Sequence, residues 1–312
     1  MSFNNPGEPT KKEREEHDLT HIPYRSWCYH CVSGRGKEHP HFEDKHGEKE
    51  DRVPVVAMDY CYLGSEGQEG VPPTLVMKCA KSKAIFSHRC EQKGPALEWI
   101  VKRVVRDLGI LGWSKVVLKC DQEPSIVALQ NAVIAERSGQ VVAAGAPGPE
   151  ATIPENSKAY DHQSNGLAER GVQEVQGIAR TVKHHIEYKL GITINYDHPI
   201  IAWMTEHVST LFNRYTVGRD GRTPYERLKG KQSSIRMPPF AEKVLYKFQG
   251  EISHMPKLEP RWSEGVFLGV NGRTDEYIIG TPTGTVKARS IQRVPDSEKW
   301  DRKAVEGVKY FP

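Results

Sequence analysis

The sequence has 312 residues, of which 44 are lysine or arginine and 40 are aspartate or glutamate, so its net charge is only +4. With 37% hydrophobic and 27% charged residues, the composition is that of a globular protein and excludes fibrous, collagen-like and wholly disordered chains. No apolar run approaches the roughly 20 residues that a membrane helix needs, and the polar start is unlike a secretory signal. We therefore expect an intracellular protein with no membrane partner.

The first 52 residues are dense in charge and contain one cluster of histidines and cysteines, His17, His21, Cys28 and Cys31, with the spacing H-x3-H-x6-C-x2-C. A C-x2-C thiolate pair with two imidazoles one helical turn apart is a tetrahedral Zn²⁺ ligand set. Six cysteines spread over this length also favour a metal site over a disulfide scaffold. His39 and His41 are an alternative pair of imidazoles, and a charged tail with incidental cysteines is the alternative to any metal site.

From residue 53 onward the pattern changes to that of an α/β domain. Residues 53–58, 74–79 and 83–88 are short runs that read as strands, and an aspartate, Asp59, follows the first of them. Residues 95–108 have apolar side chains at the i, i+3, i+4, i+7 spacing of an amphipathic helix. The domain is thus predicted to begin with three strands and a helix.

The next stretch continues the alternation of strands and helices. Residues 115–119 predict a fourth strand that delivers Asp121, and residues 124–137 predict a helix that Gly139 ends. Residues 140–144 read as one more short strand, and the proline-rich residues 145–164 read as a loop. We therefore expect a mixed sheet of five strands.

The rest of the chain changes from helices to short β segments. Residues 165–190 and 200–212 predict two helices, and His184 and His185 are expected on the surface of the first. Residues 244–294 contain short strand-like runs punctuated by glycine, which are typical of a small β-barrel or meander. The four remaining cysteines lie singly in or beside strands and are expected to be reduced core thiols: Cys61, Cys79, Cys90 and Cys120.

Three acids stand where a metal site could form. Asp59 and Asp121 follow two strands that we expect to be neighbours, and Glu169 lies in the first turns of the helix after the proline loop. Three like charges held together repel one another unless a cation lies between them, and hard oxygen ligands select Mg²⁺ or Mn²⁺. An aspartate after a strand is often only a turn or capping residue, so the prediction depends on the three acids together.

The helix that carries Glu169 also has polar groups suited to a phosphate backbone. Gln173, Arg180 and Lys183 lie on the same face as Glu169, and Arg170 follows it directly. Cations in the last β segments, Lys287, Arg289 and Arg293, interleave with aromatic residues, and Lys287 and Arg289 alternate with smaller residues as on one face of a strand. We expect these side chains to contact DNA phosphates, and an ordinary solvated surface is the alternative in both places.

At these residues the sequence resembles the integrase of copia-type retrotransposons. Residues 163–170 (QSNGLAER) match its Q-x-N-G-x-x-E-R signature, and Asp59 and Asp121 stand where its first two acids would. Residues 222–231 (RTPYERLKGK) resemble its T-P-Y-E-x-x-x-G-K segment, and residues 262–270 (WSEGVFLGV) its G-x-F-L-G segment. Three motifs in the right order make the resemblance fairly specific over about residues 52–294.

The resemblance implies an RNase H-like core in which Asp59, Asp121 and Glu169 bind the catalytic metal ions. It implies 3′-end processing and strand transfer of retrotransposon DNA, with element ends and target DNA as partners, a homo-oligomeric state and action in the nucleus. The implied domains are a zinc-binding segment in residues 1–52, the catalytic core in residues 53–230 and a DNA-binding β module in residues 231–312. Residues 170–312 carry 23 basic and 16 acidic side chains, which suits phosphate binding.

Two alternatives share parts of this prediction. A domesticated or decayed integrase would bind nucleic acid through the same basic surfaces without catalysis. An RNase H-type nuclease would use the same metal chemistry but would not explain the motifs after residue 220. The intact acids favour an enzyme, and strand transfer onto DNA distinguishes it from both alternatives.

Overall fold

The computed structural model describes residues 7–36, 53–64, 71–144, 151–156, 166–247 and 257–312. The chain forms two compact units, which we call the mixed-sheet unit and the β-module unit. The mixed-sheet unit consists of Gly36–Gln176 and Val217–Gln232, and the β-module unit consists of Met1–Arg35, Gly177–Thr216 and Ser233–Pro312. Among the described helices, none is long and apolar enough to cross a membrane.

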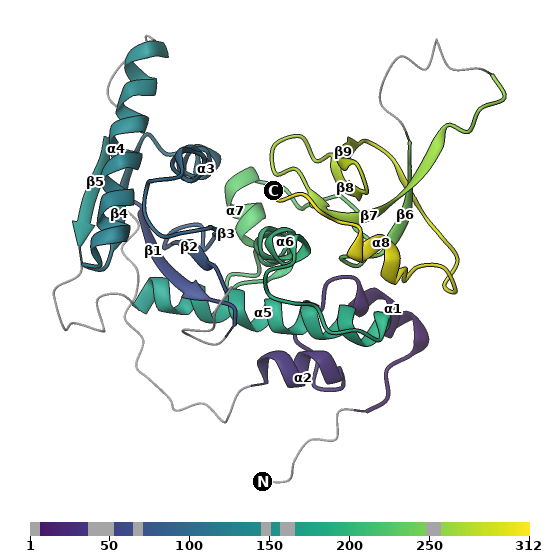
Figure 1. The fold of residues 1–312 in the computed structure, drawn as a ribbon. Coiled ribbons are helices and arrows are strands. Elements are labelled where there is room, and N and C mark those ends of the chain that lie inside the picture. Colours follow the sequence, from purple (N-terminus) through teal and green to yellow (C-terminus); the bar gives the residue numbers. More distant parts are fainter. Residues whose placement is uncertain (1–6, 37–52, 65–70, 145–150, 157–165, 248–256) are drawn as a thin grey trace, which may run out of the picture. The chain divides into compact units, whose positions relative to one another are not determined.

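The mixed-sheet unit is built on five strands in the order β3-β2-β1-β4-β5. They are β1 (Val55–Tyr62), β2 (Pro73–Cys79), β3 (Ile85–Arg89), β4 (Lys115–Cys120) and β5 (Ala151–Asn156). The first three pair antiparallel, whereas β1 with β4 and β4 with β5 pair parallel. The sheet is therefore mixed and five-stranded, as the sequence predicts, and β1 and β4 lie side by side (Figure 1).

Two helices cover this sheet and close its core. Helix α3 (Glu98–Leu111) packs against α4 (Pro124–Ala144), and α4 contacts β4 and β5 (Figure 1). Strand side chains and helix side chains share one buried cluster, which includes Met58, Leu75, Leu118, Ile100 and Leu129. The burial of such side chains, worth about 1.5–3 kcal/mol each, holds the two central strands rigidly in place.

Two sequence predictions are wrong in this unit. Residues 140–144, predicted as a strand, continue helix α4 to Ala144, because a glycine such as Gly139 costs a helix only about 1 kcal/mol once the helix is propagating. The fifth strand is β5, inside the stretch predicted as a loop. Pro154 is tolerated there because β5 is an edge strand, so its missing N–H leaves no gap in the sheet.

Helix α7 (Pro224–Lys229) shows why the T-P-Y-E segment has its sequence. Thr223 is the N-cap, its side chain accepts a hydrogen bond from the backbone N–H of Glu226, and the Glu226 carboxylate accepts one from the backbone N–H of Thr223. Pro224 occupies the first helical position, where no N–H is needed. The segment is therefore a capping box, and Leu228 packs against the core of the mixed-sheet unit.

The β-module unit contains an antiparallel five-stranded meander in the order β10-β6-β7-β8-β9. Its strands are β6 (Lys243–Lys247), β7 (Trp262–Val270), β8 (Tyr277–Thr281), β9 (Gly284–Ala288) and β10 (Ile291–Arg293). Helices α6 (Pro199–Tyr215) and α8 (Arg302–Glu306) both contact β7. This part of the sequence prediction is confirmed.

The N-terminal helices α1 (Lys11–Asp18) and α2 (Tyr29–Arg35) belong to the β-module unit. Helix α5 (Gly166–Leu190) is continuous, and its second half lies in this unit. Helix α2 contacts this half of α5 at Gly34. A Cβ atom at Gly34 would lie only 2.9 Å from the Thr181 backbone, and the Gly34 carbonyl accepts a 2.9 Å hydrogen bond from Arg180. Only glycine permits this close approach.

One cation expected to face DNA, the half-exposed Arg293, is instead paired with a buried carboxylate. The guanidinium of Arg293 donates hydrogen bonds of 2.6 and 2.7 Å to the two carboxylate oxygens of Glu242, whose side chain is fully buried. Such a bidentate pair is geometrically fixed, and the loss of one partner leaves a buried charge without compensation.

Arg293→Ala is therefore expected to lower the free energy of unfolding by about 3 kcal/mol, because Glu242 would stay buried without its partner. Lys287→Ala, at an exposed cation on strand β9 of the same sheet, is the control and should change it by less than about 0.5 kcal/mol. Urea denaturation measures both. Equal stability of the two variants would contradict a structural role for Arg293.

Candidate metal centres

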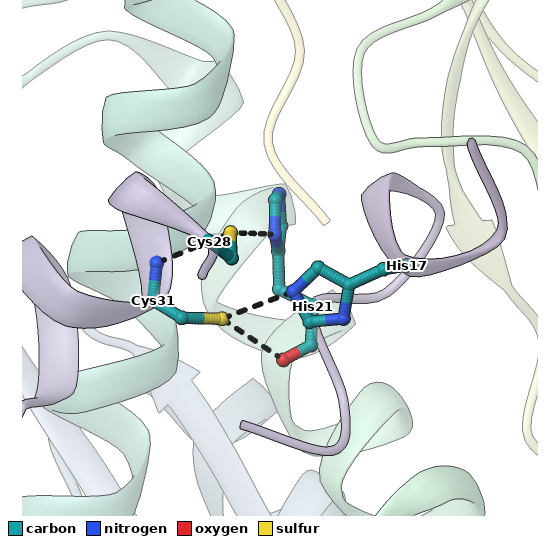
Figure 2. Close-up of side chains that lie close together, drawn as sticks. All are labelled: His17, His21, Cys28 and Cys31. Atoms are coloured by element: carbon teal, nitrogen blue, oxygen red, sulfur yellow. Dashed lines mark hydrogen bonds between the residues drawn. The ribbon is translucent and has the colours of Figure 1, made fainter. Parts of the chain in front are cut away.

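The four predicted zinc ligands come together in the β-module unit. One ligand atom each from His17, His21, Cys28 and Cys31 lie within 4.8 Å of one another, and all four side chains are buried (Figure 2). Nε2 of His17 lies 3.2 Å from Sγ of Cys31, and Nδ1 of His21 lies 3.6 Å from Sγ of Cys28. A zinc tetrahedron with bonds of about 2.3 Å to sulfur and about 2.1 Å to nitrogen has N···S edges of about 3.6 Å. The donor set therefore fits a Zn²⁺ ion.

Local structure brings the two pairs together across a short connection. A capping box at Thr10 starts α1, and His17 lies in its last turn. His21 has a left-handed backbone (φ 54°), and the bond between Ile22 and Pro23 is cis. Cys28 immediately precedes α2, and Cys31 lies within it. Six residues between the pairs are thus enough, while the alternative ligands His39 and His41 lie outside the described residues.

The electrostatics of this cluster favour one thiolate. Contacts from Cys28, and then from His17 and His21, hold the pKa of the Cys31 thiol well below its usual range despite burial. The backbone N–H of Cys31 points to Sγ of Cys28 at 3.5 Å, and the Arg35 side chain lies 3.7 Å from Sγ of Cys31. Donors around the sulfurs suit metal-binding thiolates, which carry negative charge.

A second group of possible ligands shares His21. One atom each from Asp18, His21 and His185 also lie within 4.8 Å of one another. The prediction that His185 lies on the surface of its helix is wrong: its side chain is only 3% exposed, and its neighbour His184 lies 2.6 Å from His30 between their Nδ1 atoms. The α1 and α2 segment covers this part of α5, which the periodicity of α5 alone could not reveal.

The three acids predicted to bind Mg²⁺ or Mn²⁺ lie in the mixed-sheet unit. Asp59 lies within β1 rather than after it, because the strand continues to Tyr62, and Asp121 directly follows β4. Glu169 is exposed in the first turn of α5. Within the described residues the three carboxylates do not all reach the 4.8 Å spacing of the His/Cys set. The predicted signature residues 163–165 lie outside the described residues.

The neighbouring acids nevertheless act on Asp59 electrostatically, and we call Asp59, Asp121, Glu123 and Glu169 the acidic group. Burial and the negative charges of Asp121, Glu123 and Glu169 together raise the pKa of its carboxyl to about 6, against a hydrogen bond from the Tyr60 backbone. Carboxylates that repel one another in a partly buried site are stabilised by a divalent cation. The donor set therefore fits hard cations such as Mg²⁺ or Mn²⁺.

Sequence reasoning missed two residues in or beside this acidic group. Glu123 has its carboxylate 2.8 and 2.9 Å from the ammonium of Lys93, which also lies over the rings of Tyr60 and Tyr62 at 5.5 and 5.7 Å. Ser125 donates a 2.7 Å hydrogen bond to the same carboxylate. Glu123 was detectable from its position two residues after Asp121, whereas Lys93 is 30 residues away in sequence and carried no signal.

The start of α5 is fixed against the sheet near Glu169. Gly171 faces Lys78 of β2, and a Cβ atom at Gly171 would lie 3.1 Å from Cβ of Lys78. The ammonium of Lys78 donates a hydrogen bond to Glu174, one turn further along α5, and burial lowers the pKa of Lys78. A close contact and an ion pair thus set the height and rotation of the helix that carries Glu169.

The expected DNA-contacting residues have different surroundings. Arg170 and Gln173 are exposed beside Glu169 in the mixed-sheet unit. In the β-module unit, Lys183 forms an ion pair with Glu187 and lies over the ring of Tyr196 at 5.1 Å. Arg180 donates a hydrogen bond to the Gly34 carbonyl. Lys287 and Arg289 are exposed, and Arg289 has Glu276 at 3.9 Å. The role of these residues in DNA binding stays a prediction.

No protein-family model matches this chain, and no curated protein sequence matches it. A similar arrangement occurs in the cryoEM structure of the simian T-cell lymphotropic virus intasome in complex with the PP2A regulatory subunit B56 gamma. The similarity covers 86% of this chain and 87% of that chain, at 12% sequence identity and a TM-score of 0.41. At this level of similarity, the sites of the present chain have to be assigned from its own residues.

The raised pKa of Asp59 predicts how stability depends on pH without divalent ions. Because the folded pKa of about 6 exceeds the ordinary value near 3.8, ionisation of Asp59 lowers the free energy of unfolding as pH rises through that interval. Asp59→Asn should therefore be more stable than the wild type by roughly 1–2 kcal/mol near pH 7.5, after allowance for solvent screening, and equal to it near pH 4. Denaturation in Mg²⁺-free buffer measures this difference, and a variant less stable at both pH values would contradict it.

Proposed function

We propose that this protein catalyses DNA integration as a metal-dependent polynucleotidyl transferase, with Asp59, Asp121 and Glu169 as its metal ligands. The observation that carries the proposal is the position of Asp59 on β1 and Asp121 at the end of the adjacent parallel strand β4, where burial and the charges of Asp121 and Glu169 raise the pKa of Asp59. A folded protein rarely keeps such repulsion unless the site has a use, and an Asp59 on a central strand is not needed for folding. The three motifs shared with copia-type integrases add the reaction type and the RNase H-like description of the core.

The chemistry consists of two substitutions at phosphorus. Water first attacks a phosphodiester near a DNA 3′ end, and the broken P–O bond leaves a free 3′-hydroxyl. That hydroxyl then attacks a phosphodiester of the target DNA, forming a new P–O bond while the target's own 3′-oxygen leaves. When bound, divalent ions would polarise the phosphodiester and lower the pKa of the attacking water or hydroxyl.

The remaining residues of the mixed-sheet unit have supporting roles in this proposal. Arg170 and Gln173 follow Glu169 on exposed positions of α5 and can donate to a DNA backbone passing the site. Lys93 is a further cation near Asp121, and its ammonium is paired with the Glu123 carboxylate. Together they offset the repulsion between the acidic group and DNA.

The β-module unit supplies the zinc site and a basic surface in the same proposal. A Zn²⁺ ion bound by His17, His21, Cys28 and Cys31 would fix α1 and α2, which are too short to be stable alone. Lys287 and Arg289 would track phosphates without reading bases. A homo-oligomeric state and nuclear action complete the proposal by resemblance to integrases.

A catalytically silent protein that only binds nucleic acid is the second candidate. The observation that favours it is the spacing of the acids, which within the described residues is wider than that of the His/Cys set. The silent protein would bind DNA through the same basic residues as the integrase, but it would leave the bound DNA uncut and unjoined.

Purified protein with labelled double-stranded oligonucleotides and Mn²⁺ should yield joined products, and Asp121→Asn should reduce them at least about 100-fold because a metal ligand is lost. Glu155→Gln is a matched control, because Glu155 is a half-exposed carboxylate on the neighbouring strand β5, paired with Lys119 at 2.7 Å. Binding of DNA without joined or shortened products would favour the silent protein.

The zinc site predicts a metal content that can be measured separately. The purified chain should contain about one Zn²⁺ ion, and Cys31→Ala should lose it because only three ligands remain. Cys90→Ala is the control, since Cys90 is an equally buried thiol that lies in the mixed-sheet unit. Elemental analysis gives the ratio of zinc to protein, and equal zinc in both variants would contradict the site.

A further inference from the structure

Among the described residues, three buried imidazole nitrogens at the His/Cys cluster have no hydrogen-bond partner. They are Nε2 of His21 and both ring nitrogens of His185. Buried polar atoms of this kind destabilise a folded protein when they are left unsatisfied. Both side chains are more than nine-tenths buried, so bulk water does not satisfy them. These atoms therefore point to a binding partner that the folded chain is built to hold.

The geometry of His21 separates its two nitrogens. Nδ1 faces Sγ of Cys28 at 3.6 Å, which leaves Nε2 for the opposite side of the ring. Asp18 and His185 each offer an atom within 4.8 Å of a His21 ring nitrogen and of each other. A cavity of about 10 Å³ is lined by Asp18, His21, His185 and His207, and this volume is about that of one water molecule.

Asp18 does not stabilise its own helix. It is the last residue of α1, where the negative end of the helix dipole disfavours a carboxylate. A half-buried acid at that position is better explained by what its side chain contacts.

We infer that Asp18 and His185, which we call the outer pair, support the zinc site through one water molecule held in this cavity. The water accepts a hydrogen bond from Nε2–H of His21 and donates one to the Asp18 carboxylate and one to His185. Nδ1 of His21 thereby keeps its lone pair for the metal, as is common for histidine ligands whose other nitrogen is hydrogen-bonded. The inference rests on the zinc site proposed above.

The outer pair also connects metal binding to α5. Asp18 comes from α1 and His185 from α5, so the water joins the N-terminal segment to the helix it covers. Zinc that fixes the His21 ring should therefore tighten the contact between these elements, and loss of zinc should loosen it.

The test measures zinc affinity by competition with a chromophoric chelator, together with the absorption spectrum of the Co²⁺-substituted full-length chain. Asp18→Ala should weaken zinc binding about 10- to 100-fold, with the thiolate-to-cobalt band unchanged, because all four ligands remain. Asp18→Asn should recover part of the affinity, since its amide oxygen still accepts a hydrogen bond. His185→Ala should weaken binding in the same direction, and the double variant should be weaker by less than the product of the two effects, because both act through one water.

Glu16→Ala is the control for charge, because it removes an equal charge from an exposed position of α1. Its zinc affinity should match that of the wild type. Wild-type affinity in both Asp18→Ala and His185→Ala would overturn the outer pair and leave the zinc site standing. A wild-type chain with no thiolate-to-cobalt band would overturn both the zinc site and the outer pair. Neither outcome bears on the joining of DNA, which is assigned to the mixed-sheet unit.

Discussion

The contact between α5 and β2 is the constraint on which the acidic site depends. Gly171 lies against Lys78, and the Lys78 ammonium is bonded to Glu174, so the first turns of α5 can neither lift nor rotate without breaking an ion pair at a buried lysine. Glu169 lies two residues before Gly171 and is carried by the same turns. Asp59 and Asp121 come from two adjacent parallel strands whose places the core fixes. The raised pKa of Asp59 results from this arrangement.

The second half of α5 meets a different requirement. Gly34 permits α2 to approach Thr181 closely, Arg180 bonds the Gly34 carbonyl, and His185 lies buried among the histidines of the N-terminal segment. Two short helices with little apolar surface cannot remain in place by burial alone. We propose that a metal held by their histidines and cysteines supplies the missing stabilisation.

Sequence reasoning succeeded where local chemistry decides the outcome. The approach of the four His/Cys ligand atoms, the position of Asp121 directly after β4 and the antiparallel β module all follow from short patterns. It failed where tertiary contacts decide the outcome. Helix α4 continues through residues 140–144 in spite of their two valines. Strand β5 accommodates Pro154 because it lies at the edge of the sheet. His185 was read as a surface residue because the periodicity of one element does not reveal which segment covers it. Lys93 could not be assigned because its partner, Glu123, is distant in sequence.

The central claim is that the acidic group of the mixed-sheet unit holds divalent cations for phosphoryl transfer. Anomalous X-ray diffraction from crystals of the full chain grown with Mn²⁺ and a DNA end tests it most directly. We expect manganese density within about 2.0–2.3 Å of carboxylate oxygens of Asp59 and Asp121, with Glu169 as a third ligand. Manganese absent from these carboxylates in the presence of bound DNA would contradict their role as metal ligands.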